Sequence, residues 1–316
     1  MKPKEKSKIR VGVIGAGYLG KFHAEKYAEI ESAELTAVVD TDFARAQKVA
    51  KRFNTQAFSN IKEIYHRVDA VSIVVPTSHH YPVARKMFNH NIDVLIEKPI
   101  TVTIPQASEL IRLARRKGCI IQVGHLERFN AVWKAVDKAL SEPRFVEVHR
   151  LGPFQNRGTD VDVILDLMIH DLDIVMKYIR SPIKRIDSVG VPIISSNIDI
   201  ANVRLHFNCG AVANLTASRV SDKRTRKIRF FQPDVYVSVD YDAKKAQILR
   251  KVINPDSSLP EIVGEEKAIN HADALQAELE AFIDSVKTRR APEVGGEEGK
   301  KALQVAHRIL RRMRMN

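Results

Sequence analysis

IRVGVIGAGYLG, residues 9–20, joins a short apolar run to the pattern GxGxxG at Gly15, Gly17 and Gly20. In a strand–turn–helix unit the first glycine permits the tight turn, the second lets a pyrophosphate approach the backbone, and the third lets the helix pack closely on the strand. The N-terminus of the following helix then stabilises phosphate charge. A tight glycine turn that binds nothing is the alternative. The stretch predicts that the chain opens with a βαβ unit that binds a dinucleotide.

An acidic residue stands where such a unit needs one. Asp40 lies twenty residues beyond Gly20, at the end of the next β-branched run. A carboxylate there accepts hydrogen bonds from the adenosine ribose hydroxyls and repels a 2′-phosphate, and Asp42 adds to the repulsion. The pattern therefore favours NAD over NADP as the cofactor.

Residues 9–124 alternate β-branched runs with amphipathic stretches, which is the pattern of a doubly wound parallel sheet of Rossmann type in an α/β domain. Two helical stretches, 129–140 and 163–178, then precede strand-like runs from 183 to about 252. Strands without intervening helices indicate a mostly antiparallel open sheet in an α+β domain. We therefore expect three parts: an NAD-binding Rossmann domain over 1–125, a substrate and oligomerisation domain over 126–290, and a C-terminal helix over 291–316.

Composition narrows the class of protein. The chain has 316 residues with 44% hydrophobic content, which supports two domains. Cys119 and Cys209 have the spacing of neither a zinc site nor a disulfide framework, so we expect no metal and a reducing, cytoplasmic setting. No apolar stretch approaches the ~20 residues of a membrane span. The formal charge of +13 comes without a nucleic-acid-binding motif, so an anionic small molecule explains it better than nucleic acid.

A lysine is expected at the carboxyl end of a parallel strand, where doubly wound folds bind ligands, because Glu97-Lys98-Pro99 ends the run 92–96. With the glycine turn, Pro76-Thr77-Ser78-His79-His80 and the segment 295–303, this motif resembles the glucose-fructose oxidoreductase, inositol dehydrogenase and MocA family over nearly the whole chain. The resemblance implies cofactor contacts, which we expect from Gly15, Gly17, Tyr18, Leu19, Gly20, Asp40, Thr41, Pro76, Thr77, His80, Glu97 and Lys98.

A second motif of that family pairs an aspartate with a histidine four residues later, which matches Asp166 and His170. On a helix this spacing puts both side chains on one face. The resemblance implies that the pair converges with Lys98 on the carbon that loses a hydride to nicotinamide. Met168 stands where the family often has glycine, which predicts a different substrate shape there.

The chemistry of these side chains suggests a role for each. We assign His170 as the general base, because imidazole titrates near neutrality. Lys98 stabilises charge on the reacting oxygen, and Asp166 orients the sugar or the imidazole. Taken singly, a lysine at a strand end is usually a solvated charge, and a His–Asp pair on a helix is usually a surface hydrogen bond.

Two further stretches narrow the substrate. VGHLERFN at 123–130 and DVDVILDLMIH at 160–170 resemble the branch of the family that oxidises the 3-hydroxyl of UDP-N-acetylglucosamine to a ketone, from which an aminotransferase makes a 3-amino sugar for lipid A. Arg128, Arg150 and Arg157 are candidates for contacts to the diphosphate, with solvated surface arginines as the alternative. An inositol or simple-sugar dehydrogenase is the second interpretation. A regulator that senses nicotinamide without catalysis is the third.

The strand-like runs also predict association of subunits. Apolar residues alternate through Val203, Leu205 and Phe207 and again through Val212, Leu215 and Ala217. In a sheet over 201–240 with one face on helices, a monomer would leave this apolar alternation partly exposed on the other face. We therefore expect that face to pair with a second copy in a homodimer or homotetramer.

Overall fold

The computed structural model of the chain describes residues 8–155, 161–254, 260–268 and 273–314. It divides into two compact units, which are best described separately. The first comprises residues 1–129 and 273–301, and the second comprises 130–272 and 302–316. Helix α7 (Ala274–Thr288) thus belongs to the first unit, and α8 (Gly296–Met313) contributes to both. The domain boundaries drawn from the sequence remain predictions.

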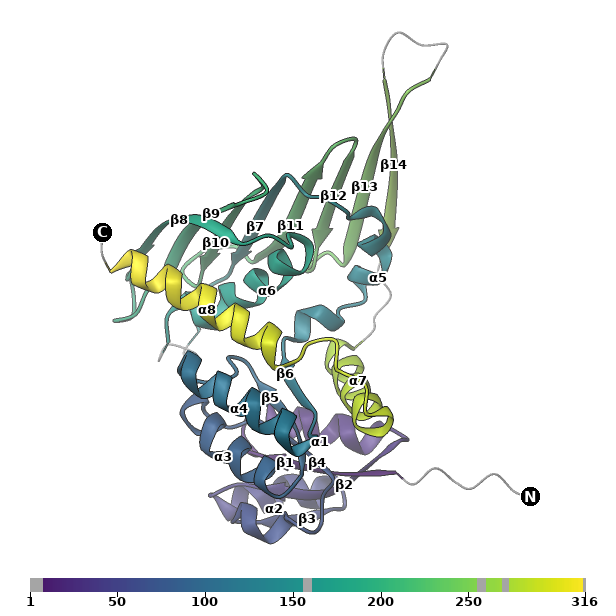
Figure 1. Cartoon of the computed structure of the whole chain (residues 1–316), viewed down its shortest axis with the longest axis vertical. Helices are drawn as coiled ribbons and strands as arrows, with labels where there is room; N and C mark the ends of the chain where they lie inside the picture. Colours follow the sequence, from purple (N-terminus) through teal and green to yellow (C-terminus); the bar gives the residue numbers. More distant parts are fainter. Residues whose placement is uncertain (1–7, 156–160, 255–259, 269–272, 315–316) are drawn as a thin grey trace, which may run out of the picture. The chain divides into compact units, whose positions relative to one another are not determined.

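The first unit is built on a six-stranded parallel sheet with strand order β3-β2-β1-β4-β5-β6 (Figure 1). The order reverses between β1 and β4, which is the switch point where doubly wound folds bind ligands. The predicted parallel sheet is confirmed, and the short β3 is an addition to it. The strands are β1 (Ile9–Ile14), β2 (Ala33–Val39), β3 (Gln56–Phe58), β4 (Ala70–Ile73), β5 (Asp93–Glu97) and β6 (Ile121–Gly124).

The helices that connect these parallel strands cover the sheet. Because such crossovers are right-handed, the direction of each connection decides which face its helix covers. The chain runs outward from β1 in one direction and from β4 in the other, so the helices of the two halves pack on opposite faces. Helix α1 packs against α7, and α3 packs against α4. The helices that connect the strands are α1 (Gly20–Glu29), α2 (Phe43–Arg52), α3 (Thr77–Asn89) and α4 (Ile104–Lys117).

Local side-chain contacts set both ends of α4. The Thr103 hydroxyl accepts a hydrogen bond from the N–H of Gln106, whose side chain accepts one from the N–H of Thr103. Pro105 occupies the first turn, where its missing N–H costs nothing. Gly118 ends the helix with a φ of 64°, in the left-handed region that favours glycine. Residues within a few positions of each end therefore set the bounds of this helix.

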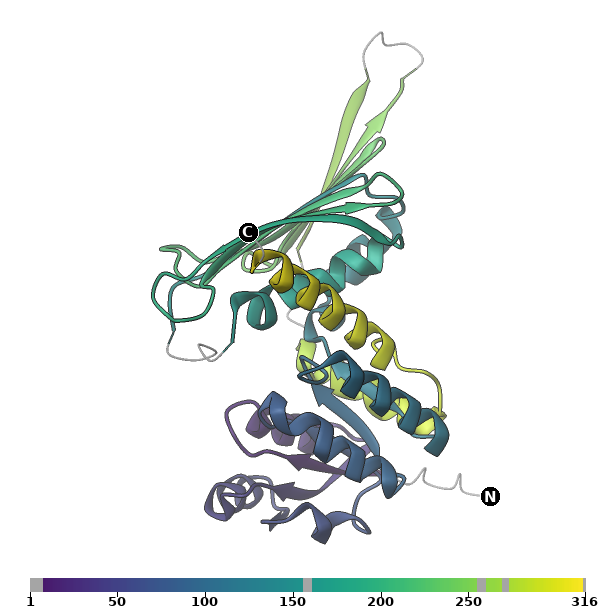
Figure 2. The ribbon, with the colours of Figure 1, turned by 60° about the vertical axis from the view of Figure 1, so that its left-hand side comes forward.

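The second unit is built on an eight-stranded sheet with strand order β14-β13-β12-β11-β7-β10-β9-β8 (Figure 1), and Figure 2 shows this sheet nearly edge-on. Neighbouring strands are antiparallel except for the pair β7 and β10, which is parallel. The mostly antiparallel sheet is confirmed, but the sequence analysis missed β7 and β14. The strands are β7 (Phe145–Leu151), β8 (Ile183–Val191), β9 (Ile200–Phe207), β10 (Val212–Ser218), β11 (Thr225–Gln232), β12 (Val235–Asp240), β13 (Lys245–Val252) and β14 (Glu261–Ala268).

The helices before this sheet differ from the predicted ones. The helix expected over 129–140 is wrong in its extent, because only α5 (Val132–Val136) is α-helical, followed by a 3₁₀ turn. Trp133 holds this short helix in the core, where it is 2% exposed. The helix expected over 163–178 is present, but it opens with a π-helical turn, η4 (Ile164–Met168), before α6 (Ile169–Tyr178).

One face of the eight-stranded sheet is covered by helices of the same unit. Val203, Leu205 and Phe207 are 0–2% exposed and pack in one core with residues of α6 and α8. Leu215 and Ala217 lie in the same core. The expectation that this apolar alternation is partly exposed in a monomer is therefore wrong, because the chain's own helices bury it.

The opposite face of the sheet is mainly polar at its β9–β10 end. The Asn202 amide donates a hydrogen bond of 2.9 Å to the Thr216 hydroxyl, and the Arg204 guanidinium donates one of 3.2 Å to the side chain of Asn214. A half-buried aromatic row of Phe145, Phe231 and Tyr236 crosses three strands nearer the other end. This face therefore combines cross-strand polar pairs with apolar surface.

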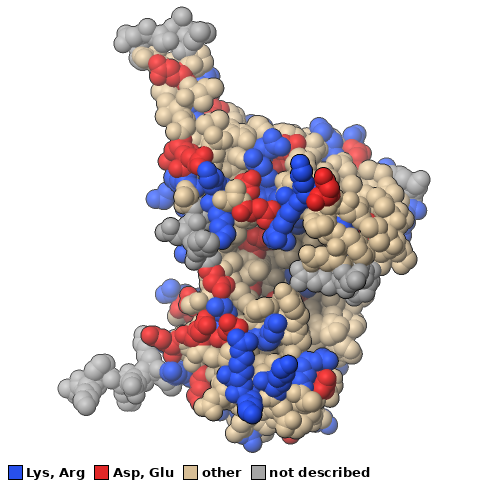
Figure 3. All heavy atoms as spheres, turned by 180° about the vertical axis from the view of Figure 1, so that it is seen from behind, with Lys and Arg blue, Asp and Glu red and all other residues tan. Residues whose placement is uncertain are grey.

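Charged side chains of both signs mix on the surface that Figure 3 shows, where lysines and arginines form small groups interrupted by acidic residues. Within the described part of the chain, the structure contains no helix with the length and apolar character of a membrane span.

Candidate active site

The glycine turn after β1 has the geometry that its sequence predicts. Gly15 has a φ of 99°, and its N–H donates a 2.7 Å hydrogen bond to the carbonyl of Val39. A Cβ on Gly20 would lie 1.7 Å from the carbonyl oxygen of Gly15, so only glycine lets α1 approach the turn this closely. A Cβ on Gly17 would meet nothing within 4 Å. Gly17 thus leaves backbone open to a ligand, as a pyrophosphate site requires.

Asp40 follows β2 and closes the same turn. One carboxylate oxygen accepts the N–H of Ala16 at 2.8 Å, and the other accepts the N–H of Asp42 at 2.9 Å. The guanidinium of Arg45 lies 3.6 Å from the Asp40 carboxylate and 3.2 Å from that of Asp42. The structure therefore brings Asp40 to the glycine turn, where a carboxylate can receive ribose hydroxyls.

Other predicted cofactor residues border the same end of the sheet. Tyr18 and Leu19 are 60% and 47% exposed, which is unusual for large apolar side chains and leaves them available to a ligand. Thr41 is exposed beside Asp40, and Pro76 and Thr77 stand at the start of α3.

His80 is placed differently from these residues. Its side chain is 1% exposed, and its two ring nitrogens lie 2.9 Å from the carbonyl oxygens of Val75 and Pro99. Burial lowers the pKa of His80 and favours the neutral ring. The structure thus gives His80 the role of joining the loop after β4 to the loop after β5.

Lys98 follows the carboxyl end of β5 and is half-buried next to the half-buried Glu97. The Glu97 carboxylate accepts the N–H of Lys98 at 3.2 Å and lies 3.1 Å from Nε2 of His23. Burial alone raises the pKa of Glu97, but the His23 hydrogen bond and the positive charge of Lys98 outweigh it and hold this pKa below its usual value. A Cβ on Gly124 would lie 3.1 Å from the Glu97 carboxyl, so this glycine leaves room for it.

A second buried acid, which the sequence analysis missed, lies near Glu97. Glu278 on α7 is 0% exposed, and neither of its carboxyl oxygens has a hydrogen-bond partner among the described residues. Burial and the negative charge of Glu97 raise the pKa of Glu278 well above its usual value. The Gln122 amide donates a 3.0 Å hydrogen bond to the Glu278 backbone carbonyl, which ties α7 to β6. Glu278 therefore keeps its proton to higher pH than an exposed glutamate does.

Asp166 and His170 lie on consecutive turns of one helix in the second unit, both half-buried. Asp166 belongs to the π-helical turn η4, and His170 to the first turn of α6. Single π turns inside helices are rare and often mark functional sites. Met168 is 0% exposed within the core, so its side chain fills core volume and does not line the exposed side of the helix.

The three candidate arginines have different surroundings. Arg150 on β7 is 4% exposed and donates two hydrogen bonds of 2.8 Å to the carboxylate of Asp171. Its guanidinium lies in this buried pair, and a contact from Arg150 to a diphosphate stays a prediction. Arg128 is 9% exposed in the first unit, and Arg157 lies outside the described residues. The pairing could not be predicted from the sequence because Asp171 lies 21 residues after Arg150, in the helix that follows β7.

Comparisons with known proteins agree with these features. The model of an oxidoreductase family with an NAD-binding Rossmann fold matches residues 9–125. UDP-N-acetylglucosamine 3-dehydrogenase of Acidithiobacillus ferrooxidans is 36% identical over 302 residues, which is 95% of this chain and 96% of that protein. Its solved structure covers 96% of this chain and 97% of its own with a TM-score of 0.91.

Inositol dehydrogenases are more distant relatives. Myo-inositol 2-dehydrogenase of Thermotoga maritima is 24% identical over 321 residues, with 95% of this chain and 94% of that protein covered. The structure of scyllo-inositol dehydrogenase from Lactobacillus casei with bound NAD(H) and scyllo-inositol is 20% identical, with a TM-score of 0.82 and 98% of each chain covered. This second likeness shows the shared fold.

Two glycine variants test the turn after β1. Gly17→Ala should leave the melting temperature nearly unchanged but weaken NAD binding by about tenfold or more, because the added methyl group meets only the ligand. Gly20→Ala should lower Tm by more than about 4 °C, because its methyl group collides with backbone. Thermal unfolding and NAD titration by fluorescence measure both effects. Wild-type NAD affinity in Gly17→Ala would show that no pyrophosphate approaches this turn.

The buried carboxyl of Glu278 predicts a pH-dependent stability. Since its folded-state pKa is raised, the unfolded chain loses this proton at lower pH than the folded chain does, so the wild type loses stability as pH rises above the ordinary glutamate pKa. The loss reaches about 1.4 kcal/mol for each pH unit until the folded-state pKa is passed. Glu278→Gln should remove it, so that the variant's Tm exceeds that of the wild type increasingly with pH. Glu280→Gln, at an exposed position of the same helix, is the control. Parallel Tm curves for wild type and Glu278→Gln would contradict the prediction.

Proposed function

Since this chain belongs to the oxidoreductase family with an NAD-binding Rossmann fold, we propose that it oxidises the 3-hydroxyl of UDP-N-acetylglucosamine to a ketone with NAD as the hydride acceptor. The observation that carries the proposal is the 36% identity with a UDP-N-acetylglucosamine 3-dehydrogenase over 95% of the chain, together with a TM-score of 0.91 to its structure. A ketone at this carbon suits an aminotransferase that makes a 3-amino sugar. An inositol or simple-sugar dehydrogenase is the second candidate, favoured by relatives of 24–30% identity.

The first unit has the features that hold the cofactor. The open backbone at Gly17 and the N-terminus of α1 receive the pyrophosphate, and the Asp40 carboxylate receives the ribose hydroxyls. Tyr18 and Leu19 offer exposed apolar surface beside them. When bound, NAD supplies the acceptor for the hydride that leaves the sugar carbon.

Proton removal is assigned to the chain's own residues. His170 accepts the proton of the sugar hydroxyl while the C–H electron pair leaves as hydride, so the carbon becomes a ketone and the ring nitrogen an N–H. The Lys98 ammonium donates a hydrogen bond to the oxygen as negative charge develops on it. Asp166, four residues before His170, orients the sugar or the imidazole.

The uncovered face of the eight-stranded sheet supports the proposal that the protein is a homodimer or homotetramer. The aromatic row of Phe145, Phe231 and Tyr236 lies on the face without helices, with ring centroids 5.5 and 5.1 Å apart. A second copy of the sheet would bury this row. Across a twofold axis, the polar pairs of β9 and β10 would face the same pairs of the second copy. We also propose a cytoplasmic location, because both cysteines are unpaired thiols.

A substrate panel tests the reaction. The protein is mixed with NAD and UDP-N-acetylglucosamine, inositols or simple sugars, and NADH absorbance is followed. We expect turnover with UDP-N-acetylglucosamine, lowered roughly 10²- to 10⁴-fold in His170→Ala with NAD affinity retained. Lys98→Met should lose turnover and cofactor affinity together. His66→Ala, at an exposed histidine of the first unit, is the control. Turnover only of inositols would favour the second candidate, and NAD binding without any turnover would favour a nicotinamide sensor.

Light scattering at micromolar concentration tests the assembly. We expect a dimer or tetramer for the wild type, and smaller particles for Phe231→Asp, because a charge buried in the sheet face opposes association. Lys62→Asp in the first unit should leave the mass unchanged. A monomeric wild type would refute the proposed pairing.

A further inference from the structure

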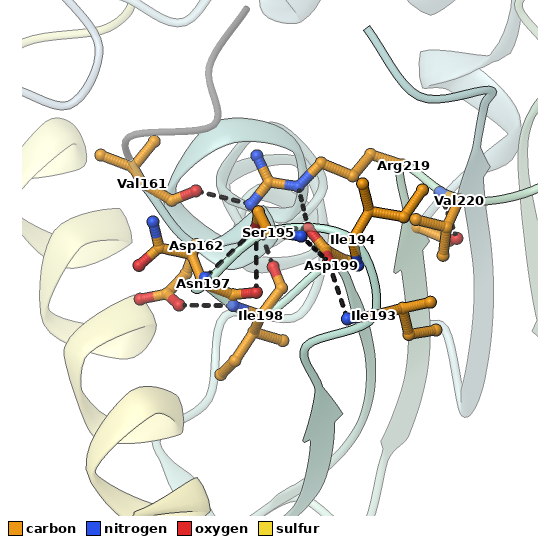
Figure 4. A network of polar contacts seen from close by, with 11 residues as sticks. Val161, Asp162, Ile193, Ile194, Ser195, Asn197, Ile198, Asp199, Arg219 and Val220 are labelled. Carbon is orange, nitrogen blue, oxygen red and sulfur yellow. Dashed lines mark hydrogen bonds and ion pairs between the residues drawn. The ribbon is translucent and has the colours of Figure 1, made fainter. Parts of the chain in front are cut away.

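A cluster of buried polar groups contacts the segment that leads into the helix carrying Asp166 and His170 (Figure 4). Its centre is Asp199, which is 0% exposed at the start of β9, and Arg219, which is 5% exposed directly after β10. We call these two residues the Asp199–Arg219 anchor. Both residues adjoin strands that follow the helix in the chain, and no sequence pattern distinguishes them.

The Asp199 carboxylate organises the loop between β8 and β9. Its Oδ2 accepts the backbone N–H groups of Ile193, Ile194 and Ser195 at 2.8, 2.6 and 2.8 Å. Its Oδ1 accepts the hydroxyl of Ser195 at 2.7 Å and lies 3.0 Å from Nε of Arg219. So many donors on one buried carboxylate fix both the loop and the orientation of the arginine.

The arginine then fixes the chain segment that opens the helix. A terminal nitrogen of Arg219 donates to the carbonyls of Val161 at 2.6 Å and Ile198 at 3.1 Å. The same Ile198 carbonyl accepts the N–H of Val163 at 3.0 Å, and the Ile198 N–H donates to the Asp162 carboxylate at 3.0 Å. Figure 4 shows these contacts converging from three segments. Residues 161–163 are therefore pinned by directional bonds on both sides.

The pinned segment leads directly into the π-helical turn. The Asp162 carbonyl accepts the N–H groups of Leu165 and Asp166, both at 3.0 Å. A π turn is less favourable than a regular turn and persists where its surroundings fix it. The direction in which Asp166 points, and with it the start of α6 that carries His170, thus depends on where the anchor holds residues 161–163.

We propose that Arg219 and Asp199 are positioning residues for the acid–base pair Asp166 and His170, acting through the π turn. The inference rests on the proposed function, which places that pair at the reacting carbon. A role in stability alone would not need this geometry, since a buried ion pair contributes little net stability compared with well-packed apolar side chains. The Arg219 guanidinium orients neighbouring chain segments through hydrogen bonds of fixed direction, which apolar side chains cannot form.

Arg219→Lys separates positioning from charge. The lysine keeps a cation for Asp199 but cannot reach both backbone carbonyls with a planar fork. Well below the Tm of the variant, we expect kcat on the sugar that the wild type oxidises to fall roughly 10- to 100-fold, because small displacements of catalytic groups are this costly. The dissociation constant of NAD should change by less than about twofold, since the cofactor residues lie in the other unit. Arg185→Lys, in an exposed ion pair with Asp187 of the same sheet, should have wild-type kcat.

Titration of the His170 imidazole by nuclear magnetic resonance adds a readout that needs no turnover. The His170 signal is assigned with His170→Gln, and its pH midpoint should differ from the wild type in Arg219→Lys but not in Arg185→Lys. Asp199→Asn is measured in the same way if Arg219→Lys does not fold. Wild-type kcat with a lower Tm would show that the anchor only stabilises the fold and would overturn the inference, as would a parallel fall of kcat and NAD affinity.

The failure of the proposed function is recognised separately. A wild-type protein that oxidises no sugar of the panel refutes that function. The pH midpoint of the His170 imidazole is then the measurement that tests the role of the anchor. An unchanged midpoint in Arg219→Lys overturns the inference. A shifted midpoint supports the inference that the anchor sets the position of His170 on its helix.

Discussion

The contact between Gly15 and Gly20 is the constraint on which the first unit depends. Because no side chain separates the turn from α1, the helix lies close enough to the sheet for His23 to reach Glu97 at the end of β5. The turn that receives the cofactor and the strand end that carries Lys98 are therefore connected through one helix. A change in the approach of α1 alters the phosphate site and the charge beneath the lysine together.

Buried carboxyl groups of this chain are accommodated in two opposite ways. Asp199 and Asp171 are each paired with a buried arginine, and the hydrogen bonds of its own loop outweigh burial to hold the pKa of Asp199 well below its usual value. Glu278 has no such partner among the described residues and stays protonated instead. By linkage, Asp199 stabilises its unit at pH values above the ordinary carboxyl pKa and loses this effect in acid, whereas Glu278 destabilises its unit as pH rises.

Features set by neighbouring residues could be predicted from the sequence. The glycine turn depends on backbone conformation within a few residues, so its sequence pattern was sufficient to predict it. The strand β7 was missed because its inward positions include Arg150, whose charge is acceptable there only through Asp171. Arg219 and Asp199 are also distant in the sequence. Arg219 therefore resembles the many other basic residues of the chain, and its contact with Asp199 could not be predicted.

The acid–base pair shows why spacing alone does not determine a site. A spacing of four residues from Asp166 to His170 predicts one angle between the two side chains in a regular helix, but the π turn changes that angle. Met168, at the family's usual glycine, is 0% exposed and fills core volume within the turn. Its effect on the substrate must therefore pass through the position of the backbone. Two chains with the same motif can thus present the same two side chains at different angles, according to the core residues and loop contacts that hold the turn.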